Sequence, residues 1–327
     1  MFGIAKGFTQ CWSSTAYGQL AMQGVLGMNR RNHSYIARYN PRHLYPLVDD
    51  KLKTKRLAEE YSVRVPQLIG AIENQHDCIL LESLVKSHKG FCIKPCKGSG
   101  GKGIIVITDR TAEGFIKANG QVVSALNLQR HISNILAGLF SLGGKADIAL
   151  IETLIHTDTR MRAFTHEGVP DLRVIVFCGF PVMAMMRLSC KASGGKANLH
   201  QGAVGVGIDI KTGKAVNAIQ NGGIIQYHPD TQQELSVLQV PAWQELLELA
   251  CGCYDMTGLG YLGVDLVLDR DQGPLLLELN ARPGLSIQLA NKAGLLPRLQ
   301  AVEQLKKIER YTNLERVAFA REHFAAL

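Results

Sequence analysis

A short acidic stretch in the C-terminal third of the chain carries residue types that bind metal ions. The sequence LGVDLVLDRDQGPLLLELNARPG, at 262–284, holds two apolar runs separated by turn-forming residues. Runs of this length, joined by such a turn, predict a β-hairpin with strands at 262–268 and 274–280. Within it, Asp265, Glu278 and Asn280 supply two carboxylates and an amide oxygen. These are the hard oxygen ligands that Mg²⁺ takes beside nucleotide phosphates.

The pairing of the two strands decides whether the acidic residues meet. Side chains alternate between the faces of a strand, so Leu276 is expected on the same face as Glu278. If Leu268 pairs with Leu275, the antiparallel register sets Asp265 directly across from Glu278. Two close carboxylates in an apolar hairpin repel each other and are costly to desolvate, and a bound cation would compensate both. The plainer alternative is a hairpin whose polar residues face solvent.

A glycine-rich run lies between two apolar segments and comprises Gly98, Ser99, Gly100, Gly101, Lys102 and Gly103. It matches the pattern G-x-G-x-x-G, but a dinucleotide-binding loop opens a helix, whereas this run joins the strands 91–95 and 103–108. It is not a Walker A loop, because glycine follows the lysine, and the protein-kinase triplets His-Arg-Asp and Asp-Phe-Gly occur nowhere in the chain. At a hairpin tip, glycines let backbone N–H groups close over phosphates. We therefore interpret the run as a phosphate flap, with Lys94 beside it; a floppy turn with a surface lysine is the alternative.

These motifs lie among elements that mix strands and helices. Short apolar runs bounded by Gly, Pro or Asp predict strands at 91–95, 103–108, 147–152, 172–177 and 181–186, besides the acidic hairpin. Helical patterns cover about 122–142, 241–256 and 297–325. A further helix is expected to start with Asp49 or Asp50 as its N-cap, with Lys51 and Lys55 on one face. The chain is therefore predicted to be an α+β protein with mostly antiparallel sheets in two lobes.

The composition excludes several classes of protein. With 327 residues, 46% hydrophobic and 20% charged, the chain is globular and long enough for two modest cores. No apolar run approaches the roughly 18 residues of a membrane helix, and no signal-peptide stretch is found, so a cytoplasmic protein with no membrane partner is expected. The eight cysteines form no CxxC pair and are expected to be reduced and mostly buried. The formal charge of +8 suits any polyanion, including nucleotide phosphates.

Residues 1–48 are basic and irregular in pattern. Basic residues lie there among tyrosines, namely Arg30, Arg31, Arg38, Arg42 and His43 among Tyr35, Tyr39 and Tyr45. Two interpretations stay open, a solvated basic arm and a surface that binds a substrate or partner. A nucleic-acid-binding protein would need a basic stripe with aromatic residues, and only residues 30–45 provide one, so nucleic acid is not the expected partner.

In their order along the chain, these motifs resemble the ATP-grasp superfamily. The series runs from DDKLKTKRLAEEYSVRVP through FCIKPCKGSGGKGIIVI, IALIETLIHTD, PDLRVIVFCGFPVMAMMR and GGKANLHQGAVGVGID to LGVDLVLD and LLLELNARPG. It is similar to the α-L-glutamate ligase branch, which includes the ribosomal-protein glutamate ligase, over about residues 49–290. The resemblance implies an ATP-grasp fold, in which two α+β lobes clasp ATP between them.

The resemblance also implies a division of the chain. Its parts are a short basic N-terminal region (1–48), an N-terminal ATP-grasp lobe with the flap (49–152), a C-terminal lobe with the metal site (153–296) and a C-terminal helix (297–327). Family ligases carry a full domain before the nucleotide lobes, whereas only residues 1–48 precede them here. Part of the usual acceptor site is therefore absent, or is supplied by residues 1–48 or by another subunit.

Nucleotide and metal contacts follow from the resemblance position by position. The nucleotide-binding positions look like Lys51, Lys94, the flap from Gly98 to Gly103 with Ser99 and Lys102, and the hinge strand with Glu152, Thr153 and Leu154. Asp158 stands where the ribose contact is expected, although many relatives carry glutamate in this part of the hinge. Asp265, Glu278 and Asn280 look like ligands of Mg²⁺, with two ions expected and Mn²⁺ as a substitute.

Positions near the γ-phosphate and the acceptor look like Arg173, Arg187 and Asn198, and Arg282 and Ser286 look like substrate contacts. The resemblance implies an ADP-forming ligase that joins a carboxylate to an amine through an acyl phosphate. The expected partners are ATP, a glutamate-like amino acid and a carboxylate or peptide acceptor, and a homo-oligomer is left open. An ATP-grasp phosphotransferase acting on a small molecule is the alternative.

Overall fold

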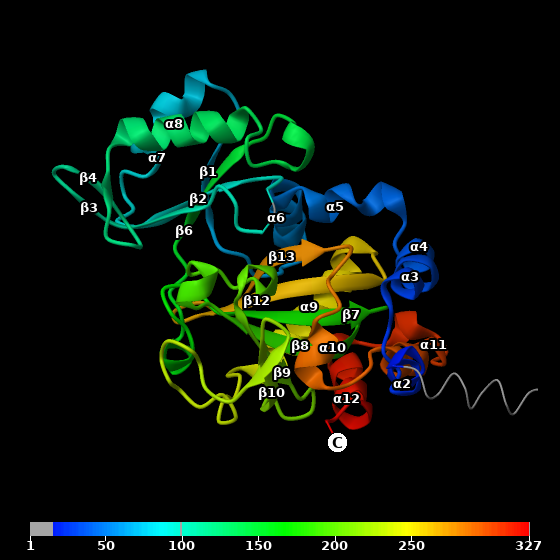
Figure 1. Ribbon diagram of the computed structural model, residues 1–327. Coiled ribbons are helices and arrows are strands. Elements are labelled where there is room, and N and C mark those ends of the chain that lie inside the picture. Colours follow the sequence, from blue (N-terminus) through cyan, green and yellow to red (C-terminus); the bar gives the residue numbers. More distant parts are fainter. Residues whose placement is uncertain (1–15, 99, 327) are drawn as a thin grey trace, which may run out of the picture.

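The computed structural model describes residues 16–98 and 100–326, so Ser99 of the expected flap lies outside the described residues. The chain forms two lobes, each built on one antiparallel sheet (Figure 1). The N-terminal lobe carries the flap, and the C-terminal lobe carries the acidic hairpin. This confirms the α+β fold with antiparallel sheets in two lobes.

The sheet of the N-terminal lobe has six strands in the order β1-β6-β2-β3-β4-β5. Its strands are β1 (Leu68–Ile72), β2 (Phe91–Pro95), β3 (Ile105–Thr111), β4 (Gly114–Lys117), β5 (Val122–Val123) and β6 (Ala149–Thr153). Helices α7 (Leu81–Leu84) and α8 (Ala125–Leu136) lie against it, and α8 buries Leu128, Ile132 and Ile135 at helical spacing. These side chains pack with Phe91 and Ile151 of the sheet into one core.

Helix α8 is shorter than the expected helix at 122–142. Its N-terminus is set by Ser124, whose side chain accepts the N–H of Asn127. Val122 before it pairs in β5 instead, and Gly138 after it has a positive φ of 83°, which the helix cannot continue.

Helix α6 (Lys51–Glu60) begins where the sequence indicates, and Asp50 is the capping residue of the two candidates. Its carboxylate accepts the backbone N–H groups of Leu52 and Lys53. The helix leads directly from α5 (Pro46–Asp49) and lies beside the end of β2, where the N–H of Lys51 donates to the carbonyl of Cys96. This cap fixes the direction in which α6 presents Lys51 and Lys55.

The C-terminal lobe has a seven-stranded sheet in the order β11-β10-β9-β8-β7-β12-β13. Its strands are β7 (Asp171–Phe177), β8 (Phe180–Leu188), β9 (Val204–Ile208), β10 (Ala215–Gln220), β11 (Gly223–Ile225), β12 (Tyr261–Asp269) and β13 (Gly273–Asn280). Helix α9 (Trp243–Thr257) packs on β7, β8, β12 and β13, and α10 (Ile287–Asn291) packs on β8, β9 and β10. Every residue of β7 and β12 is buried, so these strands form the centre of the larger core.

The acidic hairpin forms, but the register assumed for it is wrong by one residue. Leu268 pairs with Pro274 rather than with Leu275. A β-bulge at Leu277 inserts one extra residue before Glu278, which restores the expected pairing of Asp265 with Glu278. The bulge also interrupts the alternation of side chains, so Leu277 rather than Leu276 shares the cleft with Glu278, while Leu276 is buried in the core.

The N-terminal stretch is helical where it is described, not irregular. It forms α2 (Ala16–Met22), α3 (Met28–Arg30), a π-helical turn η1 (Arg31–Ile36) and α4 (Ala37–Tyr39) before α5. Leu26, Tyr35 and Ile36 are buried in the core of the C-terminal lobe. A solvated arm is therefore the wrong interpretation from Leu26 onward, because apolar side chains between the arginines anchor the stretch.

The expected helix at 297–325 is two helices, α11 (Leu296–Glu303) and α12 (Asn313–His323). Lys307, with a positive φ of 56°, breaks the path between them. Thr312 and Glu315 form a capping box that starts α12 afresh. Short 3₁₀ turns complete the described chain: η2 (Arg42–Leu44), η3 (His76–Leu80), η4 (Leu142–Gly144), η5 (Thr159–Phe164), η6 (Lys191–Ser193), η7 (Leu199–Gln201) and η8 (Ile308–Arg310).

The structure also bears on two expectations from composition, which concern membrane-spanning helices and the state of the cysteines. Within residues 16–98 and 100–326, no helix combines the length and the apolar character needed to cross a bilayer. The cysteines of the same ranges are all free, and all except Cys92 are buried, as expected for reduced core thiols.

Candidate functional site

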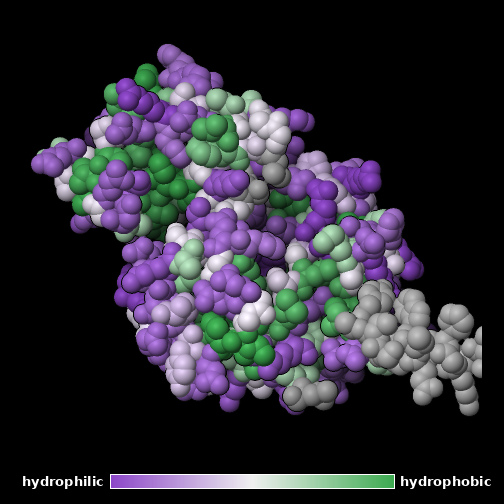
Figure 2. Space-filling model, in the orientation of Figure 1, coloured by the Kyte–Doolittle hydropathy of each residue, from purple (hydrophilic) through white to green (hydrophobic). Residues whose placement is uncertain are grey.

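A cleft of about 690 Å³ lies between the two sheets. Hydrophilic residues gather along the seam between the lobes (Figure 2). Of the residues singled out from the sequence, the following line the cleft: Lys94, Gly100, Gly101, Glu152, Thr153, Leu154, Arg173, Arg187, Asn198, Asp265, Glu278, Asn280, Arg282 and Ser286. Residues that are far apart in the chain thus meet in one cavity.

The flap closes the cleft from the N-terminal lobe. β2 pairs with β3 in an antiparallel hairpin, as expected for a loop that joins two strands. Gly100, Gly101 and Gly103 have positive φ values of 63°, 72° and 74°, a conformation that glycine adopts without strain. The carbonyl of Gly100 accepts a hydrogen bond of 2.9 Å from Nε2 of Gln201, in the opposite lobe. The flap therefore bends over the cleft, while the exposed Lys102 does not line it.

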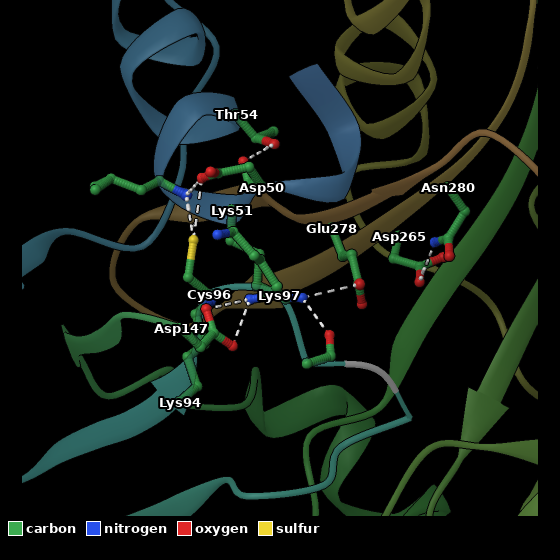
Figure 3. A network of polar contacts seen from close by, with 12 residues as sticks. Asp50, Lys51, Thr54, Lys94, Cys96, Lys97, Asp147, Asp265, Glu278 and Asn280 are labelled. Atoms are coloured by element: carbon green, nitrogen blue, oxygen red, sulfur yellow. Dashed lines mark hydrogen bonds and ion pairs between the residues drawn. The ribbon is translucent and has the colours of Figure 1, made fainter. Parts of the chain in front are cut away.

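Lys51 lies beneath the flap rather than in the wall of the cleft. Its Nζ donates a hydrogen bond of 2.8 Å to the carbonyl of Gly98 and lies 3.2 Å from Oε1 of Glu278 (Figure 3). One ammonium group thus contacts both the base of the flap and the acidic hairpin. Helix α6 thereby joins the two lobes at the site.

A buried ion triad forms part of the cleft wall, to which Lys94 and Glu152 contribute. Glu152, on β6 and 3% exposed, has Oε2 at 2.7 Å from Nζ of Lys94 and Oε1 at 2.9 Å from Nζ of Lys55. Burial acts to raise the pKa of Glu152, but the charges of Lys94 and Lys55 outweigh it and hold this pKa below its ordinary value. At Lys94, burial acts to lower the pKa, but the charge of Glu152 outweighs burial and raises this pKa above its ordinary value. At Lys55, burial outweighs the charge of Glu152 and lowers the pKa.

Lys55 was not among the residues assigned a role from the sequence. The available signal was its position one helical turn after Lys51 on α6, which places both lysines on the same side of the helix. Its importance depends on Glu152, which is distant in sequence and becomes a neighbour only when α6 packs beside β6.

Two arginines and two carboxylates form a second charged cluster on the C-terminal lobe. Asp265 pairs with Arg173 across β12 and β7, and Asp171 pairs with Arg187 across β7 and β8. Oδ2 of Asp265 lies 2.8 Å from Nη2 of Arg173 and 2.8 Å from Nη2 of Arg187. Nε of Arg173 also donates to Oδ1 of Asp265, and Nε of Arg187 donates to Oδ1 of Asp171. The cross-strand neighbours of three adjacent strands thus form one network.

The two carboxylates of this cluster differ in pKa. Burial raises the pKa of Asp171 to about 7, although Arg187 opposes the shift. Burial also acts to raise the pKa of Asp265, but the charges of Arg173 and Arg187 outweigh burial and hold this pKa below its ordinary value. Sequence reasoning missed Asp171, whose signal was its spacing of two residues before Arg173, which puts both side chains on one face of β7.

In the structure, basic side chains of the protein itself compensate the carboxylates of the acidic hairpin, a role that the sequence argument gave to a bound cation. Arg173 and Arg187 already compensate Asp265, and Lys51 lies beside Glu278. Across residues 16–98 and 100–326, no group of three or more His, Cys, Asp or Glu side chains is arranged to hold a metal ion.

The donors of the hairpin nevertheless fit Mg²⁺. Asp265, Glu278 and Asn280 line the same cleft, and Nδ2 of Asn280 lies 3.3 Å from Oδ2 of Asp265 (Figure 3). Two carboxylates and one amide oxygen, completed by phosphate oxygens and water, make a set that Mg²⁺ accepts. Glu278 and Asn280 are only partly buried, so their side chains are accessible from the cleft.

The end of β6 and the hinge after it place Thr153, Leu154 and Ile155 in the cleft wall, but not Asp158. Oδ1 of Asp158 accepts from Nε of Arg160 at 2.9 Å, and Oδ2 accepts from Nη2 at 2.7 Å. The carboxylate also caps the turn η5 through the backbone N–H of Arg160. Asp158 therefore does not line the cleft, and neither do Gly98, Lys102 and Gly103.

Two antiparallel sheets that clasp a cleft, with a glycine flap on one lobe and an acidic hairpin on the other, define the chain as an ATP-grasp protein. More narrowly, the model of the sugar-transfer associated ATP-grasp family matches residues 30–304, and the chain belongs to this family. The match begins within the N-terminal helical stretch, before the first residue of the resemblance found in the sequence.

Solved structures with a similar fold share little sequence with this chain. D-cycloserine synthetase DcsG is 15% identical, with a TM-score of 0.46 over 90% of this chain and 86% of that chain. The D-alanine–D-alanine ligase from Bacillus anthracis, complexed with ATP, is 14% identical, with a TM-score of 0.42 over 85% of this chain and 66% of that one. The ATP-grasp ligase PsnB, complexed with minimal precursor, is 14% identical, with a TM-score of 0.43 over 81% of this chain.

The match spans 63% of the PsnB chain, less than two thirds of its length. The comparison with curated proteins gives no match.

Proposed function

We propose that the protein is an ATP- and Mg²⁺-dependent ligase that joins a carboxylate to an amine and forms ADP. The observation that carries the proposal is that groups from both lobes meet in one cleft. The N-terminal lobe contributes the glycine flap and Lys94, and the C-terminal lobe contributes the arginine–carboxylate cluster. Phosphoryl transfer depends on positioning and charge stabilisation, and these groups supply both. This part of the proposal concerns the type of reaction and does not name its substrates.

Each part of the cleft has a role in this reaction. Lys94 and the backbone N–H groups around Gly100 and Gly101 bind the phosphates of ATP. Asp265, Glu278 and Asn280 hold magnesium, which supplies a Lewis acid that neutralises the charge developing on the phosphates. Arg187 stabilises the γ-phosphoryl group while a bound carboxylate attacks its phosphorus and ADP leaves. The amine then attacks the acyl carbon, phosphate leaves, and the amine loses a proton.

The finer part of the proposal is the amino acid, for which we propose a glutamate-like substrate. Support comes from the cations Lys196 and Arg282, which line the cleft on the C-terminal lobe and suit a substrate with an extra carboxylate. A carboxylate or peptide then serves as the second substrate. The flap, folded toward Gln201, excludes water from the hydrolysable acyl phosphate.

The test is a screen of amino acids and carboxylates for ADP release, with products identified by mass spectrometry. We expect ADP and phosphate only when a carboxylate and an amine are both present, and hydroxylamine should trap the activated carboxylate as a hydroxamate. Glu278→Gln should abolish turnover, whereas Glu82→Gln, an exposed control on α7, should not. Formation of AMP would contradict the proposal, and a phosphorylated product that survives hydroxylamine would indicate a phosphotransferase instead.

A further inference from the structure

The N-terminal helical stretch packs against the segment that leaves the acidic hairpin. This exit segment, residues 281–284, follows Asn280 and carries Arg282 into the cleft wall. Three contacts from the N-terminal stretch, made by Arg31, Asn40 and Tyr45, reach the exit segment. The contacts join residues that are more than 230 positions apart, so they form only in the folded lobe.

Asn40 is the buried anchor of this interface. It is 2% exposed, and its Nδ2 donates to the carbonyl of Tyr261 at 2.8 Å and to the carbonyl of Ala281 at 3.0 Å. Its Oδ1 accepts the backbone N–H of Tyr261 at 2.8 Å. One amide therefore ties the start of β12 to the residue that follows β13, and its donors and acceptor all have partners.

Arg31 contacts Pro283 of the exit segment, and Tyr45 contacts Arg282 itself. Nη1 of Arg31 donates a hydrogen bond of 2.7 Å to the carbonyl of Pro283. The guanidinium carbon of Arg282 lies 5.2 Å from the centre of the Tyr45 ring, a cation–π arrangement. Arg282 is itself exposed toward the cleft, so without such a contact its long side chain would sample many rotamers.

We propose that Asn40 and Tyr45 are positioning residues that hold Arg282 at the mouth of the cleft, where it binds an anionic group of the glutamate-like substrate. This inference rests on the proposed ligase function. The sequence left open whether part of the usual acceptor site is absent, is supplied by residues 1–48 or is supplied by another subunit. The inference assigns this part of the substrate site to the N-terminal stretch. Asn40 fixes the backbone of the exit segment, and the Tyr45 ring orients the guanidinium, which pairs with a carboxylate or phosphate.

The experiment compares Tyr45→Leu, Tyr45→Phe and Arg282→Ala in the ADP-release assay. A cation–π contact at an exposed site is worth about a two- to fivefold change in binding. We expect Tyr45→Leu to raise the KM for one substrate by this factor, with kcat and the KM for ATP unchanged. Tyr45→Phe, which retains the ring, should restore the wild-type KM. Tyr61→Leu, at an exposed tyrosine after α6, is the matched control and should change none of these values.

A double-mutant cycle separates positioning from general loss of structure. If Tyr45 acts through Arg282, Tyr45→Leu should add nothing in the Arg282→Ala background. Additive effects, an equal change in every kinetic constant, or a Tyr45→Phe variant as impaired as Tyr45→Leu would overturn the proposal.

Hydrogen exchange distinguishes a failure of this inference from a failure of the proposed function. If the wild-type protein releases ADP with no pair of substrates, the ligase proposal fails. The positioning role is then tested separately by amide hydrogen exchange in residues 281–284. Asn40→Asp should accelerate this exchange, while exchange in β2 stays unchanged. Unchanged exchange in 281–284 would overturn the positioning role whatever the reaction.

Discussion

The substitution Glu152→Gln tests how Lys94 and Lys55 are stabilised in the interior. Glu152 is 3% exposed, and Lys94 and Lys55 are each 5% exposed, so the change leaves two ammonium groups in the interior without a counter-charge. Removing one partner of a buried ion pair costs about 3–5 kcal/mol. A domain has about 5–15 kcal/mol of stability in total, so the N-terminal lobe should lose a large part of it.

The loss should depend on pH in a defined direction. The pKa of Glu152 in the folded protein lies below its ordinary value of 4.5, so its contribution is fully present above pH 4.5 and is lost as the pH falls through the folded value. In Glu152→Gln, burial lowers the pKa of both lysines, and they release their protons as the pH rises toward their ordinary value of 10.5. The difference between wild type and variant should therefore be largest between these limits and shrink at both.

The assay is urea unfolding at several pH values, with hydrogen exchange of β2 and β6 to report the N-terminal lobe separately. Glu60→Gln, on the exposed end of α6, is the control and should change the free energy of unfolding by less than about 0.5 kcal/mol. A loss of under 1 kcal/mol at neutral pH, or a loss that is constant from pH 5 to pH 10, would refute the argument.

Four further outcomes can be measured. Asp265→Asn should lower ADP release by about 10²-fold or more, because it removes the charge of a proposed metal ligand that also pairs with two arginines, while the far-UV circular dichroism spectrum stays unchanged. Asp50→Ala removes the cap of α6 and should lower the free energy of unfolding by about 0.5–2 kcal/mol, seen as a lower Tm. ATP at about a hundred times its Kd should stabilise the protein by about 2.7 kcal/mol when Mg²⁺ is present, and EDTA should cancel the shift in Tm. Burial raises the pKa of Cys251 and Cys253, so a thiol reagent at neutral pH should modify them only in urea, as peptide mass spectrometry would show.

The acidic hairpin shows how far the sequence leads toward the site. Its two strands and the pairing of Asp265 with Glu278 could be predicted from composition and turn residues. The bulge at Leu277 could not, because an inserted residue leaves the apolar pattern of PLLLEL unchanged, and every leucine in the run looks equivalent. The assumed register was off by one residue, and the bulge cancelled that error at the acidic pair.

The charged networks were only partly predictable for a different reason. Asp265 stood out by its residue type and place in the hairpin, and Arg173 by resemblance, but their mutual contact depends on β12 lying next to β7, which no local pattern specifies. Asp171 and Lys55 look like ordinary surface residues in the sequence, and their burial follows from sheet order and helix docking. The N-terminal stretch looked irregular because its helices are short and its buried residues are widely spaced between arginines.

The bulge in β13 has a consequence for how the cleft can vary. Because Leu277 is the extra residue of the hairpin, its side chain lines the cleft and is not part of the hydrophobic core. Leu276 and Leu279, by contrast, are buried in that core. A smaller side chain at this position would widen the cavity beside Glu278 without opening a void in the sheet. A change at either neighbouring leucine would instead leave a cavity in the core. The hairpin thus places a replaceable cleft residue, Leu277, directly beside the acidic Glu278, so the size of the cavity can change while the acidic group is retained.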